Sequence, residues 1–147
     1  EPDAFLRMLL ANKDIICTPY RRKVQDLSKA FYNVAIKEGA DQKGDIVEIT
    51  GGPTGLMLIK REVFTKIIAL HPDLKITNPA VENPGKSHDF YYNFFDFAFK
   101  DGLLLGEDVS FCRLAIDSGF KLYANVASVT KHHGSYAWEG KYKDEME

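Results

Sequence analysis

Short apolar segments alternate with stretches of helical periodicity along this chain, and that alternation limits the folds it can adopt. Strands are predicted at residues 14–18, 31–38, 45–50, 56–59 and 121–126. Helices are predicted at residues 2–11, 61–70 and between Gly106 and Gly119. Strands and helices in this order are typical of an α/β domain with a mixed β-sheet flanked by helices.

Four segments give further predictions about the fold. The polar turn Gly39–Gly44 joins two of the strands and therefore predicts a hairpin. Residues 56–59 are all apolar, and such a run is typical of a buried central strand. Residues 25–29 predict a helical turn, and residues 78–88, rich in Pro and Asn, predict a loop that could serve as a lid.

The composition is that of an ordinary globular domain. The chain has 147 residues, which predicts a single domain, 1–147, with a core of its own. Its net charge of -2 argues against a general nucleic-acid binder. No apolar run is long enough to span a membrane, and a cytoplasmic location is expected. Cys17 and Cys112 lie in apolar stretches and predict buried free thiols, with a disulfide between them as the alternative.

Two adjacent acids, Glu107 and Asp108, begin the helix that follows Gly106. Acids are common in first helical turns because they complement the helix dipole, and this role would explain the pair equally well. The functional alternative is a general base that deprotonates a hydroxyl nucleophile. Because a helix N-terminus stabilises the anion and lowers its basicity, a base at this place needs partial burial.

A second polar cluster, residues 131–135, follows the last predicted strand. His132 and His133 on an extended chain point to opposite sides, so one of them at most would face a given cleft. An imidazole is a good ligand for Mn²⁺-like or Zn²⁺ ions, although an exposed loop position is also consistent. The loop Gly51–Gly55 predicts a tight turn or a phosphate cradle, and it lacks the Lys-Ser/Thr ending of a P-loop.

An aromatic segment and a basic segment are the remaining features. Residues 90–99 include seven aromatic side chains, and the alternation of Phe95, Phe97 and Phe99 predicts core positions. The aromatic residues that could instead stack on a sugar ring are Tyr91, Tyr92 and Trp138. The basic segment Tyr20–Lys23 predicts a solvated surface or a contact for an anionic leaving group.

Four motifs, taken in order, carry a family resemblance. They are Pro53-Thr-Gly-Leu-Met-Leu-Ile-Lys-Arg-Glu-Val-Phe64, Tyr92-Asn-Phe-Phe95, Gly106-Glu-Asp-Val-Ser-Phe-Cys-Arg113 and His132-His-Gly-Ser-Tyr136 with Glu139-Gly140 after it. They resemble the C-terminal half of GT-A-fold glycosyltransferases. The resemblance is greatest to a bacterial or viral group with Gly-Thr-Gly, Glu-Asp-x-x-Phe-Cys and His-x-Gly-Ser motifs. It covers nearly the whole chain and implies a partial GT-A fold.

The resemblance implies a role for each matching residue. Asp108 would be the catalytic base or would bind the acceptor hydroxyl, and Glu107 would orient it. His132 would be the third ligand of a divalent metal, Mn²⁺ or Mg²⁺, near the diphosphate. The donor-sugar cleft would be lined by Gly52, Pro53, Thr54 and Gly55. The implied substrates are a nucleotide-sugar donor and a carbohydrate acceptor.

The resemblance also implies that the chain is part of a longer domain. The family's Asp-x-Asp motif, which supplies its main metal ligands, is not in this chain. In the family that motif lies just before a segment like Glu1–Leu10, so we expect the acceptor-side half of a metal-dependent glycosyltransferase. The alternatives are a non-catalytic carbohydrate-binding module and an inactive fragment. An exposed sheet edge and apolar surface would favour homo-oligomers.

Overall fold

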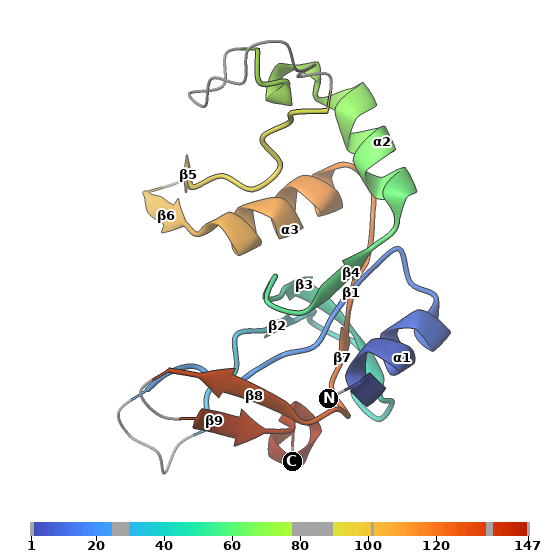
Figure 1. Cartoon of the computed structure of the whole chain (residues 1–147), viewed down its shortest axis with the longest axis vertical. Coiled ribbons are helices and arrows are strands. Elements are labelled where there is room, and N and C mark those ends of the chain that lie inside the picture. Colours follow the sequence, from blue (N-terminus) through green and yellow to red (C-terminus); the bar gives the residue numbers. More distant parts are fainter. Residues whose placement is uncertain (1, 25–29, 78–89, 101, 135–136, 147) are drawn as a thin grey trace.

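The computed structural model describes residues 2–24, 30–77, 90–100, 102–134 and 137–146. At its centre is a five-stranded sheet in the order β2-β3-β7-β1-β4 (Figure 1). Its strands are β1 (Ile15–Cys17), β2 (Ala35–Ile36), β3 (Ile46–Gly51), β4 (Met57–Ile59) and β7 (Leu122–Asn125). Because β1 and β7 are parallel and the other neighbours are antiparallel, the predicted α/β class with a mixed sheet is confirmed.

Three α-helices of the described chain cover this sheet, and they are α1 (Pro2–Ala11), α2 (Arg61–Leu70) and α3 (Glu107–Asp117). The fully buried Val63 of α2 and Phe111 of α3 pack with the inward side chains of β1, β3 and β7. On the other side lies α1 (Figure 1). There the Thr18 hydroxyl donates to the Met8 sulfur at 3.5 Å. None of these helices is long and apolar enough to cross a bilayer.

The prediction of a buried central strand at residues 56–59 is wrong, because β4 lies at an edge of the sheet. The centre is taken by β7, which pairs with β1 on one side and β3 on the other. All three residues of β4 are only half-buried. An apolar run reports contact with the core, but pairing between distant segments decides which strand lies in the middle.

The predicted hairpin between residues 31–38 and 45–50 is confirmed in a shorter form, with β2 antiparallel to β3. Gly39 in the connecting turn has a φ of 73°, a left-handed conformation that glycine adopts without strain. The helical turn predicted at 25–29 and the loop predicted at 78–88 lie outside the described residues.

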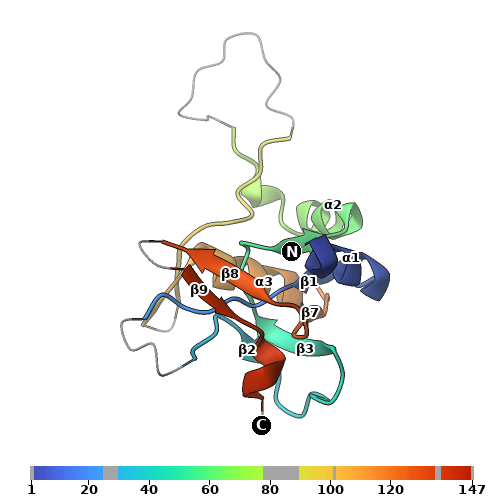
Figure 2. The same cartoon turned by 60° about the horizontal axis from the view of Figure 1, so that its bottom comes forward.

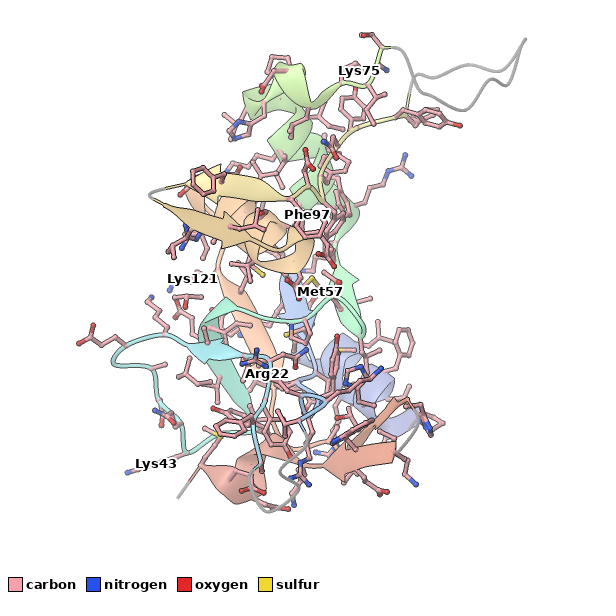
Figure 3. All side chains as sticks on the ribbon, turned by 90° about the vertical axis from the view of Figure 1, so that its left-hand side faces the viewer. Arg22, Lys43, Met57, Lys75, Phe97 and Lys121 are labelled. Carbon is pink, nitrogen blue, oxygen red and sulfur yellow. The ribbon has the colours of Figure 1, made fainter. Side chains whose placement is uncertain are left out.

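A separate pair of antiparallel strands, β5 (Ala98–Lys100) and β6 (Leu103–Leu105), stands apart from the main sheet. The prediction that Phe95, Phe97 and Phe99 are core residues is wrong, since their exposed fractions are 39%, 64% and 77%. In the described chain β5 and β6 pair only with each other; Leu105 of β6 is buried, but Phe99, Leu103 and Leu104 are exposed. Figure 3 shows Phe97 beside this hairpin and Arg22 below it, near β2 and β3.

The last strands are β8 (Thr130–His133) and β9 (Ala137–Gly140), which form another antiparallel hairpin. Figure 2 shows this hairpin running across the molecule beside the segment that follows β1. The Thr130 hydroxyl donates to the Pro19 carbonyl at 2.9 Å, which ties β8 to that segment. The two short 3-10 helices are η1 (Pro72–Leu74), after α2, and η2 (Tyr142–Glu145), after β9.

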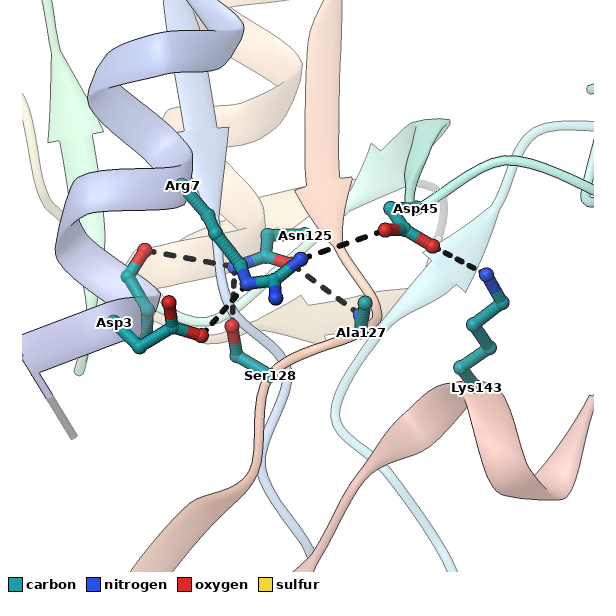
Figure 4. A network of polar contacts seen from close by, with 8 residues as sticks. Asp3, Arg7, Asp45, Asn125, Ala127, Ser128 and Lys143 are labelled. Atoms are coloured by element: carbon teal, nitrogen blue, oxygen red, sulfur yellow. Dashed lines mark hydrogen bonds and ion pairs between the residues drawn. The ribbon is translucent and has the colours of Figure 1, made fainter.

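A polar network joins α1, the start of β3 and η2 (Figure 4). Arg7 of α1 forms ion pairs with Asp3 at 2.6 Å and with Asp45 at 3.5 Å. Lys143 of η2 also pairs with Asp45, and its hydrogen bond is the main reason why the pKa of Asp45 is lowered. Nearby, the buried Asn125 donates to the Ser128 hydroxyl at 2.8 Å. The network links elements from both ends of the described chain to one end of the sheet.

Candidate functional site

A cleft of about 570 Å³ opens between α3 and the β2–β3 strands. Its polar lining comprises Arg22, Tyr32, Asn33, Thr50, Asp108 and Arg113. Its remaining lining comprises Val34, Ala35, Gly51, Gly52, Val109 and Ile116. The cleft therefore combines one carboxylate, two guanidinium groups and an apolar wall, a composition that suits a polar ligand with some apolar surface.

The first turn of α3 separates the two predicted catalytic acids. Gly106 caps the helix in an extended conformation, and Glu107 and Asp108 follow it. Asp108 is half-buried and lines the cleft, whereas Glu107 is exposed and is not in the lining. Asp108 therefore has the partial burial that a base at a helix N-terminus requires, and Glu107 does not.

The Asp108 carboxylate is held in a defined orientation. Its Oδ1 accepts a hydrogen bond from the Val109 backbone N–H at 2.8 Å. Among the described residues no other hydrogen bond or ion pair involves this carboxylate, so Oδ2 is available to a ligand. A carboxylate with one oxygen fixed and the other open can accept a proton from a positioned hydroxyl group.

Residues after Asp108 on α3 form the helical wall of the cleft. Val109, Arg113 and Ile116 all line it, at the i, i+4 and i+7 spacing of one helix face. The opposite face carries Phe111 and Cys112, which are fully buried in the core. Burial of that second face fixes the rotation of α3 and so presents Arg113 to the cleft.

Gly52 is the member of the predicted donor-sugar loop that reaches this cleft; Pro53, Thr54 and Gly55 are not in the lining. A Cβ on Gly52 would lie 2.5 Å from the Cys17 sulfur and 2.8 Å from Ile49 Cδ1, so only glycine fits there without a shift. Gly55 packs instead against the Tyr20 ring. A Cβ added to Gly55 would lie 2.7 Å from Tyr20 Cε1.

Two thiols lie behind this loop. Cys17 and Cys112 are buried and free, so the prediction of free thiols is confirmed. The Cys112 thiol donates to the Gly52 carbonyl at 3.6 Å. Burial raises the pKa of both thiols, which keeps them protonated and unreactive at neutral pH.

His132 lies on β8, outside the lining of the cleft, with its imidazole against Tyr20. The two ring centroids are 4.5 Å apart. His132 Nδ1 is 2.9 Å from the Arg21 carbonyl oxygen. A carbonyl can only accept, so Nδ1 carries the hydrogen and the neutral ring keeps its lone pair on Nε2. This is the tautomer that second-shell contacts select in metal-binding histidines.

Tyr20 lies against His132, and its pKa is influenced by the acids of α3. Burial is the main reason why the pKa of the Tyr20 phenol is raised; a hydrogen bond with Asn33 opposes this, and the negative charges of Asp108 and Glu107 raise the pKa further. The Tyr20 backbone N–H donates to the Asn33 side-chain oxygen at 3.1 Å, which ties it to a residue of the cleft. Tyr20 therefore contacts His132 directly and is tied through Asn33 to the lining of the cleft.

The structure does not bring the three predicted stacking residues together. Tyr92 forms a bridge with Lys75 near η1 and stacks on Phe94, with ring centroids 5.7 Å apart. Tyr91 precedes it in the same segment. Trp138 lies on β9, at the other end of the molecule in Figure 1, and donates to the Val24 carbonyl at 3.3 Å. None of the three lines the cleft that contains Asp108.

Tyr32 and Arg113 line the cleft, although the sequence analysis predicted no role for either of them. The Tyr32 hydroxyl is buried without a hydrogen-bond partner among the described residues. Burial raises the pKa of Tyr32 to about 12, with Glu145 as the next largest cause. Arg113 could have been found from its i+4 spacing to Val109 on the helix of the acids. Tyr32 had no such local signal, because its place depends on the bridge with Arg21.

The described residues do not by themselves form a metal centre. No group of three or more His, Cys, Asp or Glu side chains among them could hold a metal ion. His132 offers a suitable Nε2 atom, but a single imidazole is not a site.

Comparisons with protein-family models, curated proteins and solved structures find no match to this chain.

Proposed function

We propose that this chain supplies the acceptor side of a glycosyltransferase, with Asp108 as the general base. The proposal rests first on one observation: Asp108 lines a cleft of mixed polarity and is half-buried, with Oδ1 held and Oδ2 open. A general base must lie within hydrogen-bond reach of the proton that it takes, and a carboxylate in the lining of a cleft is placed where an acceptor hydroxyl could approach it. The motifs that resemble GT-A glycosyltransferases provide the second, independent support.

The proposed reaction is a displacement at the anomeric carbon of a nucleotide-diphospho-sugar. An acceptor hydroxyl forms the new carbon–oxygen bond as its proton passes to Asp108 Oδ2. The bond between the anomeric carbon and the diphosphate breaks, and the nucleoside diphosphate leaves with that electron pair. No step in this scheme depends on a metal held by the described residues.

The carbohydrate-binding alternative receives less support. It would use Tyr91, Tyr92 and Trp138 as stacking platforms, with Asp108 as a hydroxyl acceptor. Trp138 lies on β9, whereas Tyr92 forms its bridge with Lys75 near η1, so these aromatic rings do not share one surface with Asp108. Because Asp108 could serve in either function, the separation of the aromatic residues from the cleft is what disfavours this alternative.

The test is a transfer assay on the full-length gene product, with a panel of nucleotide-diphospho-sugars and release of nucleoside diphosphate as the signal. Asp108→Asn should lower the rate by about 100-fold or more, the usual contribution of a general base. Glu107→Gln is the matched control, because Glu107 is the exposed neighbour on the same turn, and it should keep most of the rate. Normal turnover by Asp108→Asn, or no turnover by the wild type with any donor, would contradict the proposal.

A further inference from the structure

Two arginines, Arg22 and Arg113, line the cleft from different elements. Arg22 follows β1, and Arg113 belongs to α3. Neither side chain has an ion pair or hydrogen bond with any described residue. Arg7, by contrast, pairs with two carboxylates. A guanidinium presents several donors in a planar fork, and a carboxylate or phosphate is the group that matches it best.

Both arginines are exposed, but the backbone beneath each of them is fixed. The Arg22 N–H donates to the Phe31 carbonyl at 2.7 Å, within the short pairing that also joins Arg21 to Tyr32. Arg113 follows Phe111 and Cys112, which are fully buried and anchor α3. Free guanidinium heads on fixed backbones can bind an anion without rebuilding the cleft.

The charges within the cleft are unbalanced. Among the described residues of the lining, Arg22 and Arg113 supply two positive charges and Asp108 supplies the one negative charge. No ion pair joins Asp108 to either arginine among the described residues. The cleft therefore retains room for one further negative charge beside a carboxylate that is open to a hydroxyl group.

We infer that the acceptor is an anionic saccharide, one that carries a carboxylate or phosphate group. Arg22 and Arg113 hold that group, and the acceptor hydroxyl faces Asp108. The apolar wall formed by Val109 and Ile116 contacts the carbon-bound face of the sugar ring. This inference rests on the proposed function, because it assigns the open carboxylate to an acceptor hydroxyl.

The experiment is a titration of the protein by nuclear magnetic resonance with three probes: sodium glucuronate, glucose 6-phosphate and neutral glucose. The two anions should bind at least about tenfold more tightly than glucose, the ratio that one charge-assisted hydrogen bond supplies. Arg22→Gln and Arg113→Gln should each remove about tenfold of that affinity. Arg61→Gln, an exposed arginine at the start of α2 and outside the cleft lining, is the matched control and should change nothing. Equal affinity for glucose and both anions would overturn the inference.

Uridine diphosphate, as a fourth probe, distinguishes an acceptor anion from the donor's diphosphate. If Arg22→Gln and Arg113→Gln weaken its binding and leave that of glucuronate unchanged, the arginines serve the donor and the inference fails. Circular dichroism confirms that each variant is folded.

Asp108→Asn separates failure of the inference from failure of the proposed function. Removal of a negative charge beside the bound anion should tighten glucuronate binding, while the same change lowers the transfer rate by about 100-fold or more. Arginine-dependent glucuronate binding with normal transfer by Asp108→Asn would refute the base and leave the anion site standing. If Asp108→Asn loses transfer but Arg22→Gln and Arg113→Gln leave the affinity for glucuronate unchanged, the anion site alone is refuted.

Discussion

The five-stranded sheet and the β5–β6 hairpin are both rich in apolar residues, but these residues differ in their exposure to solvent. In the sheet, Ile15 and Val47 are at most 1% exposed, because α2 and α3 cover them. In the hairpin, the cross-strand partners Phe99 and Leu104 are 77% and 72% exposed. The comparison shows that apolar composition does not decide burial; a strand is buried only where another layer packs on its face.

The sharpest way to break this comparison is to remove one aromatic ring from each region. Phe111 is fully buried, and its ring stacks on Phe95 at 4.4 Å. Phe111→Ala should lower the free energy of unfolding by about 3–5 kcal/mol, since it leaves a cavity in the core. Phe99→Ala should lower it by less than about 0.5 kcal/mol. Urea denaturation followed by circular dichroism measures both, and equal losses would contradict the assignment of core and surface.

A smaller loss of stability is expected from Gly52→Ala, in the loop that borders the cleft. Gly52→Ala forces a methyl group to within 2.5 Å of the Cys17 sulfur, and overpacking of this kind costs about 1–3 kcal/mol. Gly51→Ala is the matched control, because its Cβ would meet only the Ala35 methyl at an ordinary 3.6 Å. Thermal unfolding of the two variants should show a clear drop in Tm for Gly52→Ala alone. Similar melting of the two would mean that β1 and the loop are not in close contact.

The smallest change in stability, with a separate consequence for association, is expected from the exposed hairpin itself. Exposed apolar patches favour association, so we expect Phe99→Ser to reduce self-association without a measurable loss of stability. Leu10→Ser, at an 85% exposed position on α1, tests a second exposed apolar surface. Light scattering over a range of concentrations compares the two variants with the wild type. If Leu10→Ser alone reduces association, α1 and not the hairpin carries the contact.

Local sequence signals predicted the helices, but they did not predict which strands lie next to each other in the sheet. The bounds of α1 and α2 match the predicted 2–11 and 61–70, because periodicity and the proline at position 72 act within a few residues. Gly119, with a φ of 87°, ends α3 as expected of a C-terminal glycine. The edge position of β4 could not be predicted in this way, because it depends on β7, which lies far along the chain.

The candidate site also combines features that the local sequence predicted with features that only the tertiary structure decided. The sequence alone was sufficient to place Glu107 and Asp108 in the first turn of a helix, since capping and dipole preferences are local. Only the tertiary structure decided that Asp108 turns into a cleft and Glu107 does not, and that Arg22 and Arg113 share that cleft. Helices form through hydrogen bonds within a few residues, whereas a cleft forms where distant segments pack. Its residues are therefore chosen by the packing of α3 against β3, which no short stretch of the chain encodes.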